Sequence, residues 1–229
     1  MRWLILAVGF ELFLVACTDQ SAGGSHDTAS EVPDAASGCV PAGSGTLLHD
    51  NVADFTLTSC SGETFRLHDR CGGDTKAFWF VATTGWCTGC IEFLRDYVAA
   101  HGGSLSRANV GAQDPGLELM LVLGEDPAGD KPSPEYCLAW AEELHIDPAM
   151  VVLDWSDPPV EIALRPGGEL VPTSALANVW SHMTPYFADS TSAAYPWWAL
   201  LRARNMEYVW TNQAPEQSFE SARDALLAE

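Results

Sequence analysis

The stretch TTGWCTGCIEF, residues 83–93, carries two closely spaced cysteines, Cys87 and Cys90, directly after Trp86. Only a threonine and a glycine separate them. A C-x-x-C pair can hold a metal ion, form a permanent crosslink, or cycle between dithiol and disulfide. Which use applies depends on the structure that the flanking residues predict.

The residues on either side of the pair predict a strand followed by a helix. KAFWFVAT, residues 76–83, is a continuous apolar and aromatic run, typical of a buried central strand. After Cys90, apolar residues recur at helical spacing until Gly102-Gly103 ends the pattern. Cys87 is therefore expected at the start of the helix, where unpaired N–H groups and the helix dipole favour a negative sulfur.

This placement predicts different roles for the two cysteines. A lowered thiol pKa makes Cys87 the attacking nucleophile. Cys90 faces the same side of the helix and can displace a mixed disulfide. Cys90 also lies under the apolar face that Ile91 and Leu94 help to form, so burial is expected to keep its thiol protonated. The pair predicts thiol–disulfide exchange.

The rest of the chain predicts an α/β layout with a mixed sheet, because strands and helices alternate before a final hairpin and helix. Further strands are expected at 52–59, 63–67, 117–125 and 150–155, helices at 134–146 and 218–229, and a hairpin around Arg204-Asn205. The helix at 134–146 is expected to turn Cys137, Leu138, Ala141 and Leu144 inward. In residues 156–192, only a helical piece around 174–183 is indicated.

Charge and composition restrict the class of protein. The chain of 229 residues has 31 acidic and 11 basic side chains, a formal net charge of -20. Nucleic acid is excluded as a partner, because phosphate binding requires a positive surface. With 47% hydrophobic residues the chain is rich enough in apolar side chains for one core.

The first residues, MRWLILAVGFELFLVAC, form a short apolar export segment with small residues before its end. The LVAC ending resembles the lipobox of bacterial lipoproteins, which implies a signal peptide at 1–16 and a lipid on Cys17. An ordinary signal peptide cleaved elsewhere is the alternative. Residues 17–46 are small and polar, and are expected to form a flexible tether to a domain at 47–229. The expected location is the periplasmic side of the cell envelope, on a bacterial membrane.

Without Cys17, an even number of cysteines remains, which suits an exported chain in an oxidising compartment. At least one structural disulfide is expected among Cys39, Cys60, Cys71 and Cys137, and Cys60–Cys71 is favoured because it closes a short loop. A zinc site is not expected, since no second close Cys or His pair accompanies the C-x-x-C.

WCTGC after an aromatic strand resembles the WCxxC site of thioredoxin-fold oxidoreductases. VADFTLTSCSGETFRLHD, from residue 52, is similar to the hairpin of the exported TlpA/ResA-like (redoxin) family. The resemblance implies a thioredoxin-like fold, a mixed central sheet flanked by helices with an N-terminal β-hairpin extension. It further implies a membrane-anchored thiol-disulfide oxidoreductase without cofactor or metal. Its substrates would be protein thiols and disulfides, and its redox partner is unidentified.

The resemblance assigns further residues and leaves one role open. Tyr195-Pro196 looks like the family's cis-proline, which shapes the substrate groove, and Trp86 is expected to cover one side of the sulfurs. The acidic residue that the family often carries after its second cysteine is replaced by Phe93. Val81 stands where thioredoxins keep a buried aspartate. The proton acceptor is thus unassigned.

Three other functions remain open. A peroxiredoxin-like peroxidase has a threonine three residues before its cysteine, as Thr84 stands before Cys87, but Phe80 occupies the place of its upstream proline. A copper carrier would use the two cysteines with a histidine such as His182. A structural lipoprotein would keep the C-x-x-C as a closed crosslink.

Overall fold

The computed structural model describes residues 45–186 and 194–229. The predicted signal peptide, Cys17, Cys39 and most of the predicted tether lie outside the described residues. No helix in the described part of the chain is long and apolar enough to cross a membrane.

The centre of the fold is a seven-stranded mixed sheet with the order β2-β1-β5-β4-β3-β8-β9. Strand β3 (Ala77–Thr83) lies in parallel register with β4 (Leu117–Leu123), and all seven residues of β3 are buried. Burial on both faces explains why these strands are almost entirely apolar, with Glu118 of β4 as the half-buried exception. On the other side of β3, strand β8 (Trp197–Arg202) is antiparallel, and β9 (Glu207–Thr211) pairs antiparallel with β8.

The opposite side of the sheet carries the predicted N-terminal hairpin. Strand β5 (Val151–Leu153) runs parallel to β4, and β1 (Thr56–Ser59) pairs antiparallel with β5. Strand β2 (Thr64–Arg66) completes the hairpin with β1 and forms the sheet edge.

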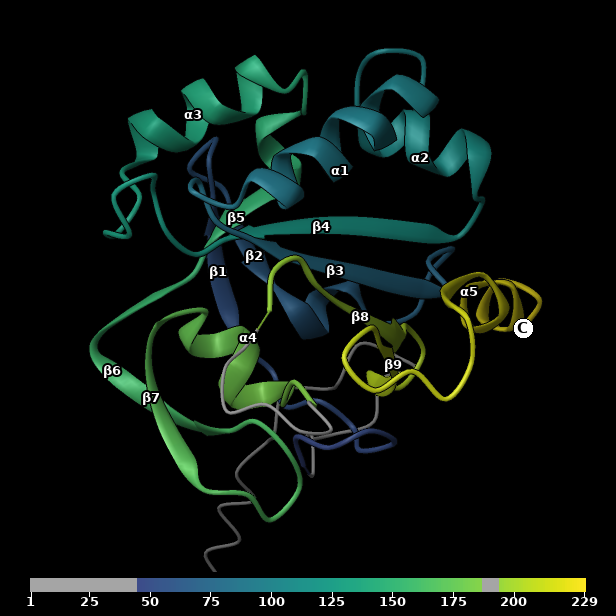
Figure 1. The fold of residues 1–229 in the computed structure, drawn as a ribbon. Helices are drawn as coiled ribbons and strands as arrows, with labels where there is room; N and C mark the ends of the chain where they lie inside the picture. The colour runs from purple at the N-terminus through teal and green to yellow at the C-terminus, as the bar shows by residue number, and fades with distance from the viewer. Residues whose placement is uncertain (1–44, 187–193) are drawn as a thin grey trace, which may run out of the picture. The chain divides into compact units, whose positions relative to one another are not determined.

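Helices cover both faces of the sheet (Figure 1). One face is packed by α1 (Thr88–Ala100), α2 (Arg107–Gln113), α3 (Pro134–Glu143) and α5 (Phe219–Leu227). The other face is covered by α4 (Ala177–His182). Single 3-10 turns occur at η1 (Leu67–Arg70) and η2 (Pro148–Met150).

A segment inserted between β5 and β8 holds the helix predicted around 174–183, which is confirmed, and a two-stranded sheet that the sequence pattern does not predict. Strands β6 (Trp155–Ala163) and β7 (Leu170–Ala175) form a separate two-stranded sheet, and α4 follows directly. We call residues 155–183 the inserted segment. Its β6 strand contains the cis peptide bond Asp157–Pro158. A proline within a stretch of sequence lowers the expectation of a strand there, which explains why β6 is not predicted.

The topology is thioredoxin-like. A parallel β3–α1–β4 crossover is joined, through the inserted segment, to the antiparallel hairpin β8–β9 and to the final helix α5. The predicted fold class, with its mixed sheet, flanking helices and N-terminal hairpin, is confirmed. The inward face predicted for α3 is wrong at one position, because Leu138 is 43% exposed and Trp140 packs inward instead.

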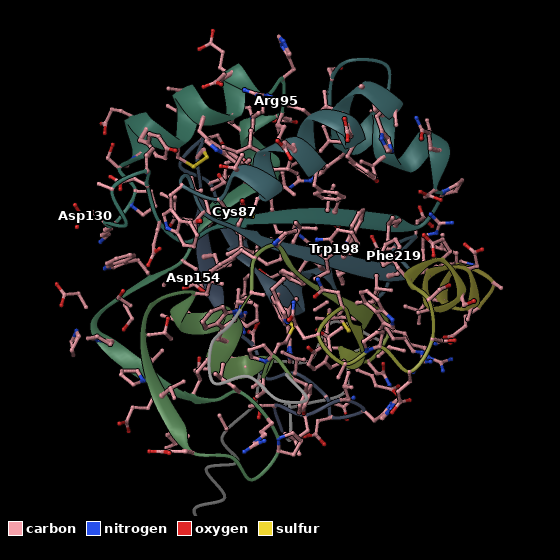
Figure 2. All side chains as sticks on the ribbon, viewed as in Figure 1. Cys87, Arg95, Asp130, Asp154, Trp198 and Phe219 are labelled. Atoms are coloured by element: carbon pink, nitrogen blue, oxygen red, sulfur yellow. A yellow bond between two sulfur atoms is a disulfide. The ribbon has the colours of Figure 1, made fainter. Side chains whose placement is uncertain are left out.

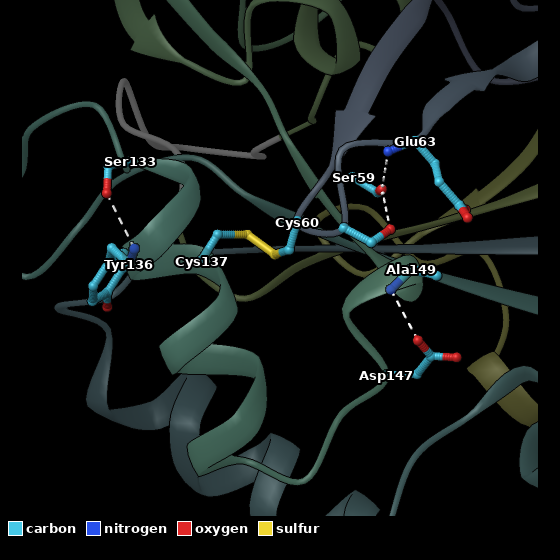
Figure 3. Close-up of a disulfide and its surroundings, with 9 residues drawn as sticks. Ser59, Cys60, Glu63, Ser133, Tyr136, Cys137, Asp147 and Ala149 are labelled. Atoms are coloured by element: carbon cyan, nitrogen blue, oxygen red, sulfur yellow. Dashed lines mark hydrogen bonds between the residues drawn. A yellow bond between two sulfur atoms is a disulfide. The ribbon is translucent and has the colours of Figure 1, made fainter.

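The expected Cys60–Cys71 pair is wrong: Cys60 is bonded to Cys137 (Figure 3). Cys60 follows β1 and packs in the core on the α1–α3 face, whereas Cys71 packs against the core on the α4 face. The sheet therefore separates the two residues that the short loop suggested. The Cys60–Cys137 bond ties the N-terminal hairpin to α3. The expectation of at least one structural disulfide is confirmed, and Cys71 is disulfide-bonded as well.

Candidate active site

The two cysteines of the WCTGC motif form a disulfide at the start of α1, with their Cα atoms 5.2 Å apart. Cys87 is the N-cap residue, and its sulfur accepts a hydrogen bond from the backbone N–H of Cys90 at 3.2 Å. Cys87 retains 7% of its surface exposed, whereas Cys90 is completely buried. The more accessible sulfur therefore lies at the positive end of the helix dipole.

The turn between β3 and α1 is shaped by the loop that follows β4. The backbone N–H of Gly85 donates to the carbonyl of Glu125 at 2.7 Å. A Cβ atom on Gly85 would lie 2.2 Å from the hydroxyl of Tyr136 and 2.9 Å from the backbone nitrogen of Pro127. Glycine is therefore required at this position, and its close packing fixes the turn that presents Cys87.

Trp86 projects from the same turn and is 47% exposed. Its indole N–H donates to the Glu125 carboxylate at 2.6 Å, and its ring lies edge-on to Tyr195 with centroids 5.7 Å apart. These contacts orient an exposed tryptophan beside the disulfide. The expectation that Trp86 covers the sulfurs stays a prediction.

The Tyr195–Pro196 peptide bond is cis, as the resemblance implies. Trp197 pairs with Ala82 of β3, so Pro196 lies level with the end of β3, from which the turn to Cys87 departs. Asn212 holds this loop: its side-chain NH2 donates to the Pro196 carbonyl at 2.9 Å, and its side-chain oxygen accepts from the Trp198 N–H at 2.8 Å. The fold thus brings the cysteine pair and Pro196 to the same edge of the sheet.

Tyr195 stacks on Trp180 of α4, with centroids 5.8 Å apart and ring planes 22° from parallel. Burial raises the pKa of Tyr195 well above its usual range, and the nearby negative charges of Glu125 and Asp154 raise it further. Its phenol is therefore neutral at physiological pH.

Asp154 is a buried carboxyl at this edge of the sheet, directly after β5, and is 1% exposed. It accepts hydrogen bonds from the backbone N–H groups of Asn178 and Val179 and from the Asn178 side chain. Burial raises the pKa of the carboxyl, although these hydrogen bonds oppose the shift. Asp154 and Cys87 both follow parallel strands, so they lie at the same end of the sheet (Figure 2).

The positions that the sequence leaves without an acid are filled by apolar packing. Val81 is fully buried in the core, and Phe93 packs against neighbouring aromatic rings. Glu92 is exposed on α1. Sequence reasoning missed four residues near the pair that only the tertiary fold brings together: Glu125, Asp154, Trp180 and Asn212.

The histidine considered for a copper site, His182, has its ring nitrogen 2.7 Å from the carbonyl oxygen of Asn178, within α4. In residues 45–186 and 194–229, no group of three or more His, Cys, Asp or Glu side chains is arranged to hold a metal ion.

The chain matches no protein-family model and no curated protein. Among solved structures it is similar to an uncharacterised conserved protein from Geobacillus kaustophilus (18% identity, 81% of this chain and 85% of that chain, TM-score 0.49). It is also similar to a secreted disulfide oxidoreductase from Mycobacterium tuberculosis (14%, 76% and 96%, TM-score 0.43). A third similar structure is an exposed lipoprotein thioredoxin from Streptococcus pneumoniae (17%, 77% and 98%, TM-score 0.41). At these levels of similarity, the thioredoxin-like fold of the chain rests on its own sheet topology.

Proposed function

We propose that the chain is a thiol-disulfide oxidoreductase that exchanges disulfides with protein clients through Cys87 and Cys90. The observation that carries the proposal is the disulfide at the N-terminus of α1, level with the cis Tyr195–Pro196 bond. Such a disulfide can be opened and re-formed without moving the strands of the sheet, because the first turn of α1 holds both cysteines.

In the reductive direction, the thiolate of Cys87 attacks a client disulfide. A mixed disulfide forms between Cys87 and the client, and the first client sulfur leaves as a thiolate. The sulfur of Cys90 then attacks Cys87, giving its proton to solvent or to a nearby base, and the second client sulfur leaves. Two electrons pass from the pair to the client, and a thiol donor must re-reduce Cys87–Cys90. The reverse sequence oxidises a client dithiol.

The client is expected to bind as an extended segment next to Pro196. The loop before β8 contacts the turn before α1 through Tyr195 and Trp86, so an extended peptide that lies next to Pro196 would also reach Cys87. Trp86 and Tyr195 then flank the bound segment.

We further propose that the domain, residues 47–229, works outside the cytoplasm on a lipid anchor. Cleavage after residue 16 would leave an acylated Cys17 at the start of the tether, residues 17–46. The LVAC sequence supports the lipid anchor. The two disulfides outside the motif support an oxidising compartment. A Cys17→Ser variant should lose membrane association on fractionation; unchanged association would reject the anchor.

The redox potential of Cys87–Cys90, together with insulin reduction and oxidation of a reduced protein, tests the enzymatic proposal. We expect a potential in the range of known exchange enzymes, on the order of -120 to -270 mV. Exchange should disappear in Cys87→Ser. A pair that mild reductants do not open would indicate a structural crosslink instead. Consumption of hydrogen peroxide in place of protein exchange would favour the peroxidase.

A further inference from the structure

Three aromatic rings from separate parts of the chain form a continuous array beside the disulfide. Trp86 comes from the turn before α1, Tyr195 from the cis-proline loop and Trp180 from α4 of the inserted segment. Trp86 lies edge-on to Tyr195 at 5.7 Å, and Tyr195 stacks on Trp180 at 5.8 Å. Geometries of this kind are the favourable ones for aromatic pairs.

Exposure decreases along the array. Trp86 is 47% exposed, Tyr195 is half-buried and Trp180 is 4% exposed. The outer two rings can therefore touch a bound client, whereas Trp180 can act only through Tyr195.

Both ends of the array are anchored. At the outer end, the Glu125 carboxylate holds the indole N–H of Trp86 at 2.6 Å. At the inner end, α4 is fixed because Asp154 binds the N–H groups of Asn178 and Val179. The carbonyl of Asp154 also accepts the N–H of Leu176 at 3.0 Å. Without these hydrogen bonds, a helix of only six residues would not hold Trp180 firmly against Tyr195.

The base of the inserted segment packs directly on the edge of the sheet that carries the pair. A Cβ atom on Gly124, at the end of β4, would lie 3.0 Å from the Cβ of Ala175. The inserted segment is therefore seated against the loop that also supplies Glu125.

We propose that Trp180 is a positioning residue for client binding: it holds Tyr195 edge-on to Trp86, so that the two outer rings form one wall of the client groove next to Pro196. This inference rests on the proposed function and adds a role for the inserted segment. Clients favoured by such a wall carry an apolar or aromatic side chain beside the cysteine that reacts, because that side chain gains ring contacts and loses water.

The proposal separates binding from thiol chemistry. Trp180 packs in the core on the α4 face, whereas α1, which carries Cys90, packs on the opposite face of the sheet. Loss of Trp180 should therefore leave the reactivity of Cys87 and Cys90 unchanged, and should make the positions of the Tyr195 and Trp86 rings less well defined. A wall that is already ordered before binding lowers the entropic cost of association, so its loss raises KM more than it lowers kcat.

The test compares Trp180→Leu with Trp140→Leu in the full domain. Trp140 is a matched control, because it is also 4% exposed but lies on α3, in the core of the opposite face. Initial rates are measured with insulin as the protein client and with bis(2-hydroxyethyl) disulfide as a small disulfide that needs no groove. The KM of Trp180→Leu for insulin should rise about threefold to tenfold, the loss expected for one aromatic pair.

In the same variant, kcat and the rate with the small disulfide should stay within about twofold of wild type. Trp180→Phe should restore KM to within about twofold, because a ring remains to stack on Tyr195. If Trp180→Leu does not fold, Trp180→Met takes its place, because the flexible methionine side chain can fill the gap without a ring, and the same rise in KM is expected. An unchanged KM in the variant that folds, or an equal rise in Trp140→Leu, overturns the inference. A wild-type chain inactive on both disulfides would instead reject the proposed function.

Discussion

The sulfur of Cys87 accepts the backbone N–H of Cys90 at 3.2 Å, so the first cysteine of the motif is also the N-cap of α1. A side chain that caps a helix in this way is stabilised when it carries negative charge, since the N–H groups and the dipole point toward it. Cys90 is bonded to this sulfur from inside the first turn, where its own side chain is fully buried.

This asymmetry predicts which sulfur reacts with clients. Cys90→Ser should trap covalent mixed disulfides with client proteins, because Cys87 can attack but nothing displaces it. Cys87→Ser should trap few or none. Non-reducing gels with mass spectrometry of the captured species measure both outcomes.

Alkylation gives an independent check of the same assignment. In the reduced wild type near neutral pH, iodoacetamide should modify Cys87 at least about tenfold faster than Cys90, from its greater thiolate fraction and access. Faster labelling of Cys90, or traps that form on Cys87→Ser instead, would contradict the assignment.

The elements that sequence patterns predict well are those whose surroundings are uniform. Strand β3 and all of β4 except Glu118 are buried, so their sequences are almost entirely apolar, and the caps of α1 and α3 leave clear signals. Helix α2 is missed because Val110 is its one buried residue, which leaves no periodicity to detect. The β6–β7 hairpin is missed because most of its residues are exposed or half-buried, so no regular alternation marks it.

The residues of the candidate site also fall into those that the sequence predicts and those that it does not. Cys87, Cys90 and Pro196 belong to short motifs and could be named from the sequence. Glu125 and Asn212 lie far along the chain from the motif and contact the site through one hydrogen bond or two. No local pattern marks such residues, since only strand pairing across the sheet brings them to the site.

The Cys60–Cys137 disulfide should contribute strongly to stability without taking part in exchange. It joins residues 77 apart in sequence, and in the chain-entropy account a long closed loop gives a large effect. The double variant Cys60→Ala/Cys137→Ala should lose about 2 to 4 kcal/mol of unfolding free energy in denaturant titrations. Its rate of insulin reduction should be unchanged at temperatures where it stays folded.

The double variant Cys87→Ala/Cys90→Ala is the matched control, because the Cys87–Cys90 disulfide joins residues only three apart in sequence. It should lose much less stability and all exchange. Peptide mapping that finds Cys60 and Cys137 as free thiols in protein from an oxidising compartment would rule out this pairing.

Gly85→Ala should disturb the turn before Trp86. The added methyl group would overlap the hydroxyl of Tyr136 and press on the backbone of Asp126 and Pro127. Overpacking of this kind costs about 1 to 3 kcal/mol, and displacement of the Glu125 loop should also slow insulin reduction. Gly111→Ala is the control: nothing lies within 4 Å of its added Cβ, and its helix should gain up to about 1 kcal/mol. Equal stability of the two variants would contradict the close packing at Gly85.

Asp154 should make the stability of the fold depend on pH in a direction unusual for a carboxyl group. Its pKa is raised, chiefly by burial, so the folded chain binds this proton more tightly than the unfolded chain does. Between the ordinary value of 3.8 and the raised one, the unfolded chain has released the proton that the folded chain keeps. The contribution of Asp154 to the unfolding free energy therefore falls as pH rises through this window, by at most about 1.4 kcal/mol per pH unit, and is constant above it.

Asp154→Asn removes this titration but keeps a side-chain oxygen that can accept the N–H groups of α4. The unfolding free energy of the variant, relative to wild type, should increase as pH rises from 3.8 through the window and then level off. Denaturant titrations at a series of pH values measure this difference. A relative stability of Asp154→Asn that decreases with rising pH would mean that the hydrogen bonds from Asn178 and Val179 outweigh burial.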